Sequence, residues 1–437
     1  METTNLDLWG GVECTINRVG DRYFNQLQRS GHCDRLQDLR HFAGFGLKTL
    51  RTPLLWEALA PVAVDQIEWR WSDRWMAEIR SLGIQPVAGL LHHGSGPRYT
   101  DLLDPEFPQK FARYAAGIAR RYPWIEFYTP INEPLTTARF SALYGHWYPH
   151  KTDDRSFARA FLNQIKAIVL AMKAIREVNP SARLVQTEDL GRVFSTPDLA
   201  YQADFENNRR WATWDLLRGE IKSQHPLWSY FEWAGVSAEE LDFFSADPCP
   251  PDLIGINYYV TSDRYLDENL EFFPPETHGG NGRQTYADDA AVRARIEGIA
   301  GAYCHIIETW HRYRTPVALT EVHLGCTLDE QLRWFMEMWR ACVRARNEDC
   351  DVRAMTVWAL LGSYDWDVLV THQNGTYEPG AFDLRSGSPR PTAIASAIRE
   401  LTQGRSYYHP ALDTDGWWRR PSRLRAPLEL NGTESTR

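Results

Sequence analysis

The sequence predicts a single (β/α)8 barrel of the α/β class, with loop insertions. Eight short segments rich in apolar and β-branched residues alternate with longer segments whose apolar residues recur every three or four positions. The 437 residues show no internal repeat, low-complexity linker or break in composition before the C-terminal region. Alternating strands and helices imply a parallel sheet, and closing eight strands into a barrel leaves no exposed sheet edge.

Eight segments are expected to form the strands of the barrel. They are Leu8–Thr15, Thr49–Leu54, Gln85–Leu91, Phe127–Ile131, Arg183–Thr187, Leu253–Asn257, Val317–Thr320 and Ala354–Ala359. Segments expected to be helical include Pro108–Tyr122, Phe157–Val178, Val292–Tyr313 and Asp329–Arg346.

An open, doubly wound sheet is the main alternative to the closed barrel. It needs a glycine-rich phosphate loop after an early strand, and Gly10-Gly11 lies inside the first strand and does not match GxGxxG.

The C-terminal region differs from the rest in composition. We expect residues 1–404 to form the barrel and residues 405–437 to form an extension. The extension contains Tyr407, Tyr408, Trp417 and Trp418, followed by a basic cluster from Arg419 to Arg425. Its aromatic side chains are expected to pack on the barrel, and its last ten or so polar residues are expected to be disordered.

Composition excludes several classes of partner. The net charge of −9 argues against nucleic acid or an anionic membrane, because either would require a basic face. No apolar segment is long enough to span a bilayer, and the N-terminus does not resemble a signal peptide. The seven cysteines form no CxxC pair, which indicates neither zinc nor a disulfide framework, and we expect a cytoplasmic protein. The 18 Trp, 19 Tyr and 18 Phe suit the aromatic platforms of sugar sites, and equally a large aromatic core.

Polar residues follow almost every expected strand, at the end where the sites of parallel barrels collect. They are Glu13 and Asn17, Arg51, His92 and His93, Asn132 and Glu133, Glu188 and Asp189, Asn257 to Tyr259, Glu321 and His323, then Trp358, Asp365 and Trp366. Carboxylates, amides, imidazoles, guanidinium groups and indoles all bind sugars. Their regular recurrence at the strand ends therefore favours a carbohydrate site over solvated loop polarity.

Two glutamates stand out among these residues. Glu133 directly follows the fourth expected strand, and Glu321 directly follows the seventh, so the two strands face each other across a closed barrel. Cleavage of a glycosidic bond needs two carboxyl groups, about 5–5.5 Å apart for retention and about 6.5–9.5 Å apart for inversion. Either glutamate alone could simply pair with a basic neighbour, but the two together indicate a catalytic pair.

The motifs around these glutamates resemble those of clan A glycoside hydrolases, most closely family 1, the β-glucosidase and β-galactosidase family. The acid/base motif of that family ends in Asn-Glu-Pro, as Asn132-Glu133-Pro134 does, and its sixth-strand motif matches Asp252–Tyr259. Its nucleophile lies in Thr-Glu-Asn-Gly, where this chain has Thr320-Glu321-Val322-His323. The resemblance extends from Leu8 to about Leu401.

The resemblance implies a retaining β-glycosidase that works by double displacement, takes a small carbohydrate or glycoside and needs no cofactor. Glu133 would be the general acid/base and Glu321 the nucleophile, with Arg51 and Tyr259 holding Glu321 ionised. The implied sugar contacts are Asn132 at the 2-hydroxyl, His92 on the glycone, Trp358 beneath it, and Asp365 with Trp366 at its far hydroxyls.

The chain departs from the family pattern in the residues that hold the glycone. Asn17 replaces a glutamine and Asp365 replaces a glutamate, so both side chains are one methylene shorter. Glu13 has no counterpart, and strand alternation would place it on the same face as Asn17. Val322-His323 replaces the Asn-Gly after the nucleophile. We expect a reshaped glycone pocket and poor turnover of ordinary glucosides, because hydrogen-bonding pockets discriminate strongly.

Other interpretations stay open. His92, His93, Glu133, Glu321 and His323 could be drawn as ligands of a hydrolytic metal, although their spacing matches no HExxH or related motif. A catalytically weak sugar-binding barrel is a second alternative, and a transglycosidase acting on the same intermediate is a third. The sugar, the aglycone, the oligomeric state and the pathway do not follow from the sequence.

Overall fold

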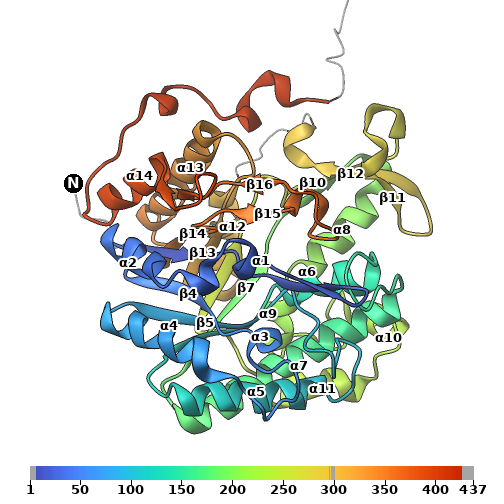
Figure 1. The fold of residues 1–437 in the computed structure, drawn as a ribbon. Helices are drawn as coiled ribbons and strands as arrows, with labels where there is room; N and C mark the ends of the chain where they lie inside the picture. Colours follow the sequence, from blue (N-terminus) through green and yellow to red (C-terminus); the bar gives the residue numbers. More distant parts are fainter. Residues whose placement is uncertain (1–5, 295, 297–300, 426–437) are drawn as a thin grey trace, which may run out of the picture.

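A closed barrel of eight parallel strands forms the centre of the computed structural model, which describes residues 6–294, 296 and 301–425 (Figure 1). The barrel strands are β1 (Asp7–Gly11), β4 (Thr49–Pro53), β5 (Gln85–His92), β6 (Phe127–Asn132), β7 (Arg183–Asp189), β9 (Leu253–Asn257), β13 (Val317–Val322) and β14 (Val352–Val357). Each pairs in parallel with its neighbours, and β14 pairs with β1 to close the ring. The predicted (β/α)8 fold is confirmed.

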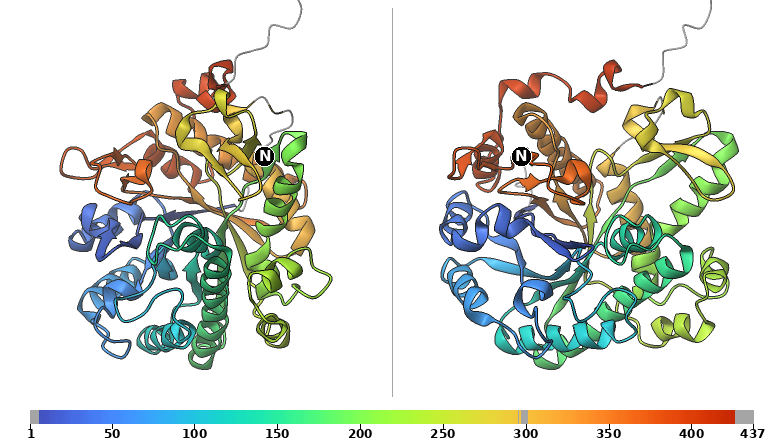
Figure 2. Two further views of the ribbon diagram at one scale, coloured as in Figure 1. Left: turned by 90° about the vertical axis from the view of Figure 1, so that its right-hand side faces the viewer. Right: turned by 45° about the vertical axis from the view of Figure 1, so that its right-hand side comes forward.

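Helices surround this ring on the outside (Figure 2). They are α1 (Gln26–Arg29), α2 (Gln37–Gly44), α3 (Trp56–Leu59), α4 (Trp69–Ser81), α5 (Phe107–Arg121), α6 (Pro134–Ala138), α7 (Asp154–Val178), α8 (Ala200–Arg209), α9 (Ala212–Leu217), α10 (Trp228–Trp233), α11 (Ala238–Ala246), α12 (Ala302–Tyr313), α13 (Leu328–Asn347) and α14 (Ala393–Leu401). The longest, α7, begins where the Asp153 side chain accepts a hydrogen bond from the Ser156 amide, and its last residue precedes Asn179-Pro180.

Smaller sheets lie among the loops. β8 (Val193–Ser195), β10 (Arg264–Asp267), β11 (His278–Gly280) and β12 (Thr285–Ala290) form one sheet. The two-stranded pairs are β2 (Ile16–Val19) with β3 (Arg22–Asn25), β15 (Ser363–Tyr364) with β16 (Tyr377–Glu378), and β17 (Phe382–Asp383) with β18 (Arg390–Pro391). These insertions build the walls above the strand ends.

Two expected elements differ from the structure. The first barrel strand ends at Gly11 rather than Thr15, because the Thr15 amide donates to the side chain of Glu13 (2.9 Å) instead of to a neighbouring strand. Glu13 and Asn17 therefore do not share a strand face, and Asn17 lies in β2. The helix expected over Val292–Tyr313 begins only at Ala302, after Gly301 with φ 59°, and part of that expected segment (295 and 297–300) lies outside the described residues.

The two ends of the barrel have opposite character. Near the beginnings of the strands, a separate apolar cluster fills the interior with Trp9, Val87, Val185, Leu253, Ala318 and Ala354. Buried polar groups follow the strands at the other end, among them Asn132, Glu133 and Glu321. The barrel is thus closed by packing at one end and carries its chemistry at the other, as parallel barrels do.

The C-terminal segment runs back across the outside of the fold after α14 (Figure 1). Trp418 is buried, whereas Tyr408 is 69% exposed, so only part of the aromatic set packs inward. The disorder expected for the last ten or so residues concerns 426–437, which lie outside the described residues.

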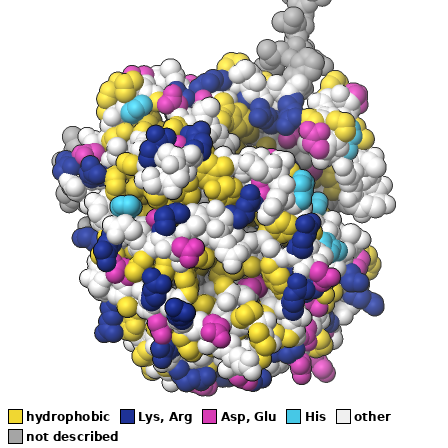
Figure 3. Space-filling model, in the orientation of Figure 1, with side chains coloured by type: hydrophobic (Ala, Val, Ile, Leu, Met, Phe, Trp, Pro, Cys, Tyr) yellow, Lys and Arg dark blue, Asp and Glu magenta, His cyan; other side chains and the backbone are white. Residues whose placement is uncertain are grey.

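The surface carries basic and acidic side chains interspersed with one another on the face drawn in Figure 3. Across the described part of the chain, no helix combines the length and the apolar character needed to cross a membrane.

Candidate active site

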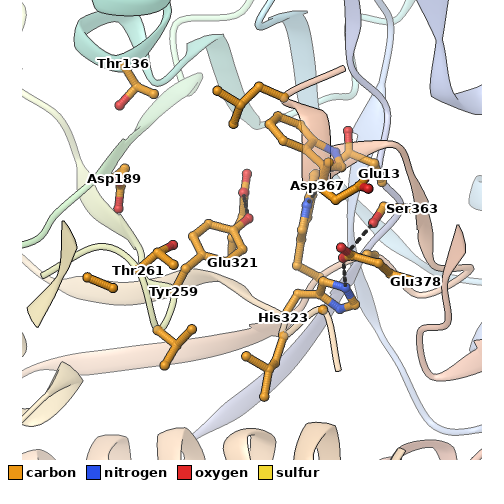
Figure 4. Close-up of a pocket in the computed structure, with 18 of the residues that line it drawn as sticks. Glu13, Thr136, Asp189, Tyr259, Thr261, Glu321, His323, Ser363, Asp367 and Glu378 are labelled. Carbon is orange, nitrogen blue, oxygen red and sulfur yellow. Dashed lines mark hydrogen bonds and ion pairs between the residues drawn. The ribbon is translucent and has the colours of Figure 1, made fainter. Parts of the chain in front are cut away.

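A cavity of about 480 Å³ opens above the carboxyl ends of the barrel strands (Figure 4). Glu133 and Glu321 both line it, so the two glutamates predicted as a catalytic pair share one chamber. In Figure 4, Glu321 and Tyr259 lie at the centre, with Glu13 and Glu378 on one side and Asp189 on the other.

Glu133 lies at the sharp turn from β6 into α6. Its backbone is in the left-handed region (φ 45°), which costs a non-glycine residue roughly 1–3 kcal/mol and persists only when the surroundings enforce it. Pro134 is the first residue of α6, where its missing N–H is no loss. Glu188, fully buried at the end of β7, accepts hydrogen bonds from the amides of Leu135 (3.0 Å) and Thr136 (3.3 Å) and so fixes the start of this helix.

The carboxyl group of Glu133 meets two side chains. Asn257 donates from Nδ2 to Oε1 at 2.5 Å, and His93 Nε2 lies 3.7 Å from Oε2. The hydroxyl of Thr320 donates to Asn257 Oδ1 at 2.7 Å, which leaves the amide nitrogen of Asn257 pointing at Glu133. Asn257, the last residue of β9, therefore positions the carboxyl group of Glu133.

Glu321 is held from two sides at the end of β13. Arg51 donates from Nη1 to Oε1 at 2.7 Å and also to the carbonyl oxygen of Thr320 at 2.8 Å. The hydroxyl of Tyr259 donates to Oε2. Burial keeps the pKa of Tyr259 well above its usual value, so this hydroxyl stays a donor.

Asn132 joins the two halves of the site. Its Oδ1 accepts from Arg51 Nη2 (2.7 Å), from the Thr187 hydroxyl (2.6 Å) and from Asn257 Nδ2 (3.3 Å). Its own amide nitrogen lies 3.3 Å from His92 Nε2. A continuous chain of hydrogen bonds therefore runs from Glu133 through Asn257, Asn132 and Arg51 to Glu321.

The two carboxyl groups lie in unequal electrostatic environments. Burial, reinforced by the charge of Glu321, raises the pKa of Glu133 well above its usual value, and the hydrogen bond from Asn257 acts in the opposite direction. Burial raises the pKa of Glu321 to about 7, although Arg51 and Tyr259 act to lower it. The expected lowering by Arg51 is thus present but smaller than the effect of burial.

An aromatic stack covers the floor of the cavity. The His92 ring stacks on Trp358 with centroids 5.2 Å apart and planes 9° apart, and the guanidinium of Arg51 lies 4.5 Å from the Trp358 ring. Burial holds the pKa of His92 well below its usual value, so the ring is neutral. Trp358 Nε1 donates to Glu13 Oε2 at 3.1 Å.

The residues predicted for the site fall into three groups. Six of the eleven line the cavity: Glu13, Glu133, Tyr259, Glu321, Trp358 and Trp366. Arg51 and His92 do not line it but contact Glu321 and Trp358 respectively, and Asn132 is bonded to Arg51 and lies 3.3 Å from His92. Asn17 and Asp365 do not line the cavity.

Asn17 and Asp365 are instead engaged in the surrounding loops. Asn17 is fully buried and donates from Nδ2 to the carbonyl oxygen of Val370 at 3.0 Å. Asp365 is also fully buried, accepts from the amide of Gly375 at 2.8 Å and pairs with Arg29. Both side chains stabilise the loop that follows β14.

Comparison with known proteins agrees with this geometry. Residues 32–377 match the family model described as glycosyl hydrolase family 1. The chain belongs to glycosyl hydrolase family 1. Membership, which confirms the predicted resemblance, indicates a retaining glycoside hydrolase acting on O-glycosidic bonds.

Solved structures of the family share the fold. The family 1 β-glucosidase from Thermotoga maritima superposes with a TM-score of 0.73 at 14% sequence identity, covering 93% of this chain and 99% of that one. The same enzyme in complex with deoxynojirimycin gives a TM-score of 0.74 at 13% identity, covering 93% and 99%. A 6-phospho-β-glucosidase from Clostridium longisporum is 24% identical over 162 residues. That match spans 34% of this chain and only 34% of the relative's length.

This family 1 member carries further polar residues on the cavity that were not predicted as site residues. His323 Nε2 and the hydroxyl of Ser363 each lie 3.3 Å from Glu378 Oε2 (Figure 4). Asp189 and Asp367 line the cavity as well. Ser363 and Glu378 lie in β15 and β16, within the long loop after β14 rather than directly at a strand end, so the strand-end rule did not select them. Asp189 ends β7 and His323 directly follows β13; both were among the strand-end polar residues expected from the sequence, but the sequence assigned them no role in the site.

The histidine and carboxylate side chains of this family 1 protein do not form a metal site in the part of the chain that the structure describes. Within the described ranges, no group of three or more His, Cys, Asp or Glu side chains is arranged to hold a metal ion. His92 instead stacks on Trp358. The ring of His93 contacts the rings of Trp147 and Trp366.

Proposed function

We propose that the chain is a retaining β-glycosidase that hydrolyses a β-linked glycoside by double displacement, with Glu133 as general acid/base and Glu321 as nucleophile. The observation that carries this proposal is the pair of buried carboxyl groups on one cavity whose environments separate their pKa values. Glu133, the more basic group, holds the proton that the leaving oxygen needs. Glu321, bonded to a guanidinium and a phenol, is the group that ionises first.

The two steps then follow from charge. Glu321 attacks the anomeric carbon while the bond to the leaving oxygen breaks and the proton of Glu133 moves to that oxygen. The resulting ester at Glu321 carries no charge, so the pKa of Glu133 falls. Glu133 can then take a proton from water as the water attacks the anomeric carbon and the bond to Glu321 breaks. Asn132 links the two groups through Arg51 and Asn257. Its proposed partner in the substrate is the 2-hydroxyl, where a hydrogen bond strengthens in the transition state.

We further propose that the glycone pocket differs from that of ordinary glucosidases and takes a glycone without phosphate. The difference from ordinary glucosidases is supported by Asn17, which donates to the Val370 carbonyl oxygen, and by Asp365, which pairs with Arg29; both side chains bind the protein rather than facing the cavity. The carboxylates of Glu13, Asp367 and Glu378 on the cavity support the second part, because they repel a phosphate group. A curated relative is a 6-phospho-β-glucosidase, so the phosphorylated sugar belongs in every substrate panel.

The organisation of the chain is part of the proposal. Residues 1–404 would be the catalytic barrel and residues 405–437 a C-terminal extension. A cytoplasmic location is supported by the seven free cysteines, of which Cys14, Cys249, Cys342 and Cys350 are buried.

Trapping the intermediate tests the proposal. The protein is incubated with 2-deoxy-2-fluoro β-glycosides of several sugars, and intact mass and peptide mass are measured. We expect one stable adduct on the peptide that contains Glu321, and none in the Glu321→Ala variant. An adduct on another residue, or no adduct with any sugar, refutes the assignment.

The sugar that gives the adduct also identifies the glycone. Nitrophenyl glycosides, including the 6-phosphoglucoside, then test the pocket. High turnover on the β-glucoside alone contradicts the altered pocket, and preference for the phosphorylated substrate contradicts the repulsion argument.

A further inference from the structure

The cavity that holds Glu133 and Glu321 is completed by a part of the chain outside the family match. That match ends at residue 377, yet Trp417 and Arg425 line the same cavity. The segment 410–425, here called the C-terminal strap, therefore adds a wall to the cavity from outside the matched residues. The strap is anchored at two places.

The first anchor lies on α13. Trp418 is 3% exposed and packs edge-on against Trp334, with ring centroids 5.1 Å apart, and its Nε1 donates to Glu337 at 2.9 Å. The amide of Trp417 donates to Glu330 Oε2 at 3.0 Å. Gly416 is required before this pair, because a Cβ there would lie 2.3 Å from the Trp418 ring. These contacts fix the position of Trp417 independently of any ligand.

The second anchor lies on the segment that follows β12. The amide of Arg425 donates to the carbonyl oxygen of Arg293 at 3.1 Å, and its guanidinium pairs with Asp289 at 2.8 Å. Arg423 donates from Nη1 to the carbonyl oxygen of Ala294 at 3.3 Å. The strap thus joins α13 to the β12 segment across the cavity wall.

The cavity wall that carries the strap is continuous with the residues beside Glu133. In Figure 4, Thr136, Asp189 and Thr261 lie on the opposite side of Glu321 from Glu13 and Glu378. Thr136 belongs to α6, which begins directly after Glu133, so this side of the cavity lies next to the group proposed to protonate the leaving oxygen.

From Thr261 the same wall continues to the strap. Three residues after Thr261, Arg264 begins β10 and pairs with Ala290 of β12. The segment that follows β12 carries Arg293, whose guanidinium lies over the ring of Trp417. All of these wall segments have residues on the cavity.

The wall formed by the strap has the chemistry of a sugar site. The guanidinium of Arg293 lies 4.1 Å from the centroid of the Trp417 ring and holds that ring in place. Asp289, Arg264 and Arg425 line the cavity beside it. A flat indole next to charged donors and acceptors matches a sugar ring, which has an apolar C–H face and a rim of hydroxyls.

We infer that the C-terminal strap completes the leaving-group subsite and that the leaving group is a second sugar ring, which packs against Trp417. This inference rests on the proposed function and names its substrate class: a β-linked disaccharide or oligosaccharide. An alkyl or aryl leaving group would contact the indole of Trp417 but would form no hydrogen bonds with Asp289, Arg264 or Arg425.

The test compares two substrates that share the glycone identified by trapping: a β-linked disaccharide and the β-glycosyl fluoride, whose leaving group reaches no wall. We expect Trp417→Ala to lower the ratio of kcat/KM for the disaccharide to kcat/KM for the fluoride about three- to tenfold, the range of one aromatic stacking contact. Trp417→Phe restores most of the ratio. Tyr408→Ala is the matched control, because it removes an exposed aromatic of the same extension that does not line the cavity. This variant leaves the ratio unchanged.

A second measurement does not depend on the leaving group. The fluoroglycosyl-enzyme is reactivated by an added acceptor sugar, whose hydroxyl attacks the anomeric carbon while its proton passes to Glu133 and the bond to Glu321 breaks. Trp417→Ala should slow this reactivation relative to reactivation by water.

Three outcomes overturn the inference. They are an unchanged substrate ratio in Trp417→Ala, an acceptor reactivation equal to that of the wild type, or a loss confined to aryl glycosides. A wild-type protein that forms no adduct on Glu321 overturns the proposed function itself, which distinguishes the two failures.

Discussion

Tyr259 offers the sharpest test of how the site keeps its nucleophile ionised. Its hydroxyl donates to Glu321 Oε2, and Tyr259→Phe removes that donor with little change in shape. A hydrogen bond to a charged group contributes about 1.5–3 kcal/mol, which corresponds to about one to two pH units. Glu321 reacts as the carboxylate, so activity rises as pH rises through its pKa, which burial sets at about 7. Loss of the donor raises this pKa and moves the acidic limb of the pH profile to higher pH.

The assay is kcat/KM against pH on the glycone identified by trapping. With half of the wild-type Glu321 ionised near pH 7, a limb moved by about one to two units lowers kcat/KM at pH 7 about five- to fiftyfold. The difference in kcat/KM between the variant and the wild type narrows as pH rises, because Glu321 of the variant then ionises too. A loss independent of pH would mean that Tyr259 acts on the substrate rather than on the charge of Glu321.

The neighbouring residue gives a matched control. The Tyr258 hydroxyl donates to Asp263 Oδ2 at 2.8 Å, away from both glutamates, so Tyr258→Phe removes an equivalent group from the same loop. We expect its acidic limb to coincide with that of the wild type. The reasoning is refuted if Tyr259→Phe keeps the wild-type limb, or if both variants move it equally.

Three further predictions concern the same site and its support. Glu13→Gln should move the acidic limb to lower pH, opposite in sign to Tyr259→Phe, because the charge of Glu13 raises the pKa of Glu321; a limb moved upward in the pH profile contradicts this. Glu133→Ala should slow substrates with poor leaving groups about 10²–10⁴-fold and abolish the alkaline limb, since Glu133 acts protonated; equal losses on glycosyl fluorides, measured as kcat/KM, would count against the acid role. Gly94→Ala should lower the free energy of unfolding by about 1–3 kcal/mol, because its Cβ would lie 1.8 Å from Glu57 Oε1; Gly44→Ala, with open space around it, is the control in urea denaturation, and equal stability of the two variants refutes the packing argument.

The barrel could be predicted because its signals are local. Each strand is a short apolar run, and each polar residue at a strand end falls on the same face of the barrel whatever the loops do. Glu133 and Glu321 are reached by this rule alone, since β6 ends directly before Glu133 and Glu321 is the last residue but one of β13. The helix expected over Val292–Tyr313 was wrong at its start because an apolar pattern cannot reveal the turn at Gly301.

The rest of the cavity depends on contacts distant in sequence. Glu378 reaches the site from β16, after a loop whose path no periodicity records, and Trp417 reaches it from the C-terminal strap. Asp365 was expected to bind hydroxyls because of its place in a motif, but Arg29, from the other end of the chain, pairs with its carboxylate. Such pairings are set by tertiary packing, so sequence spacing carries no information on them.

The hydrogen bonds of the site show why the two glutamates cannot be positioned independently. Asn132, the residue before Glu133, accepts from Arg51, which holds Glu321. Thr320, the residue before Glu321, donates to Asn257, which holds Glu133. Each glutamate is thus oriented through the strand that carries the other. A shift of either strand alters both carboxyl groups together, because both reacting groups must lie within reach of one anomeric carbon.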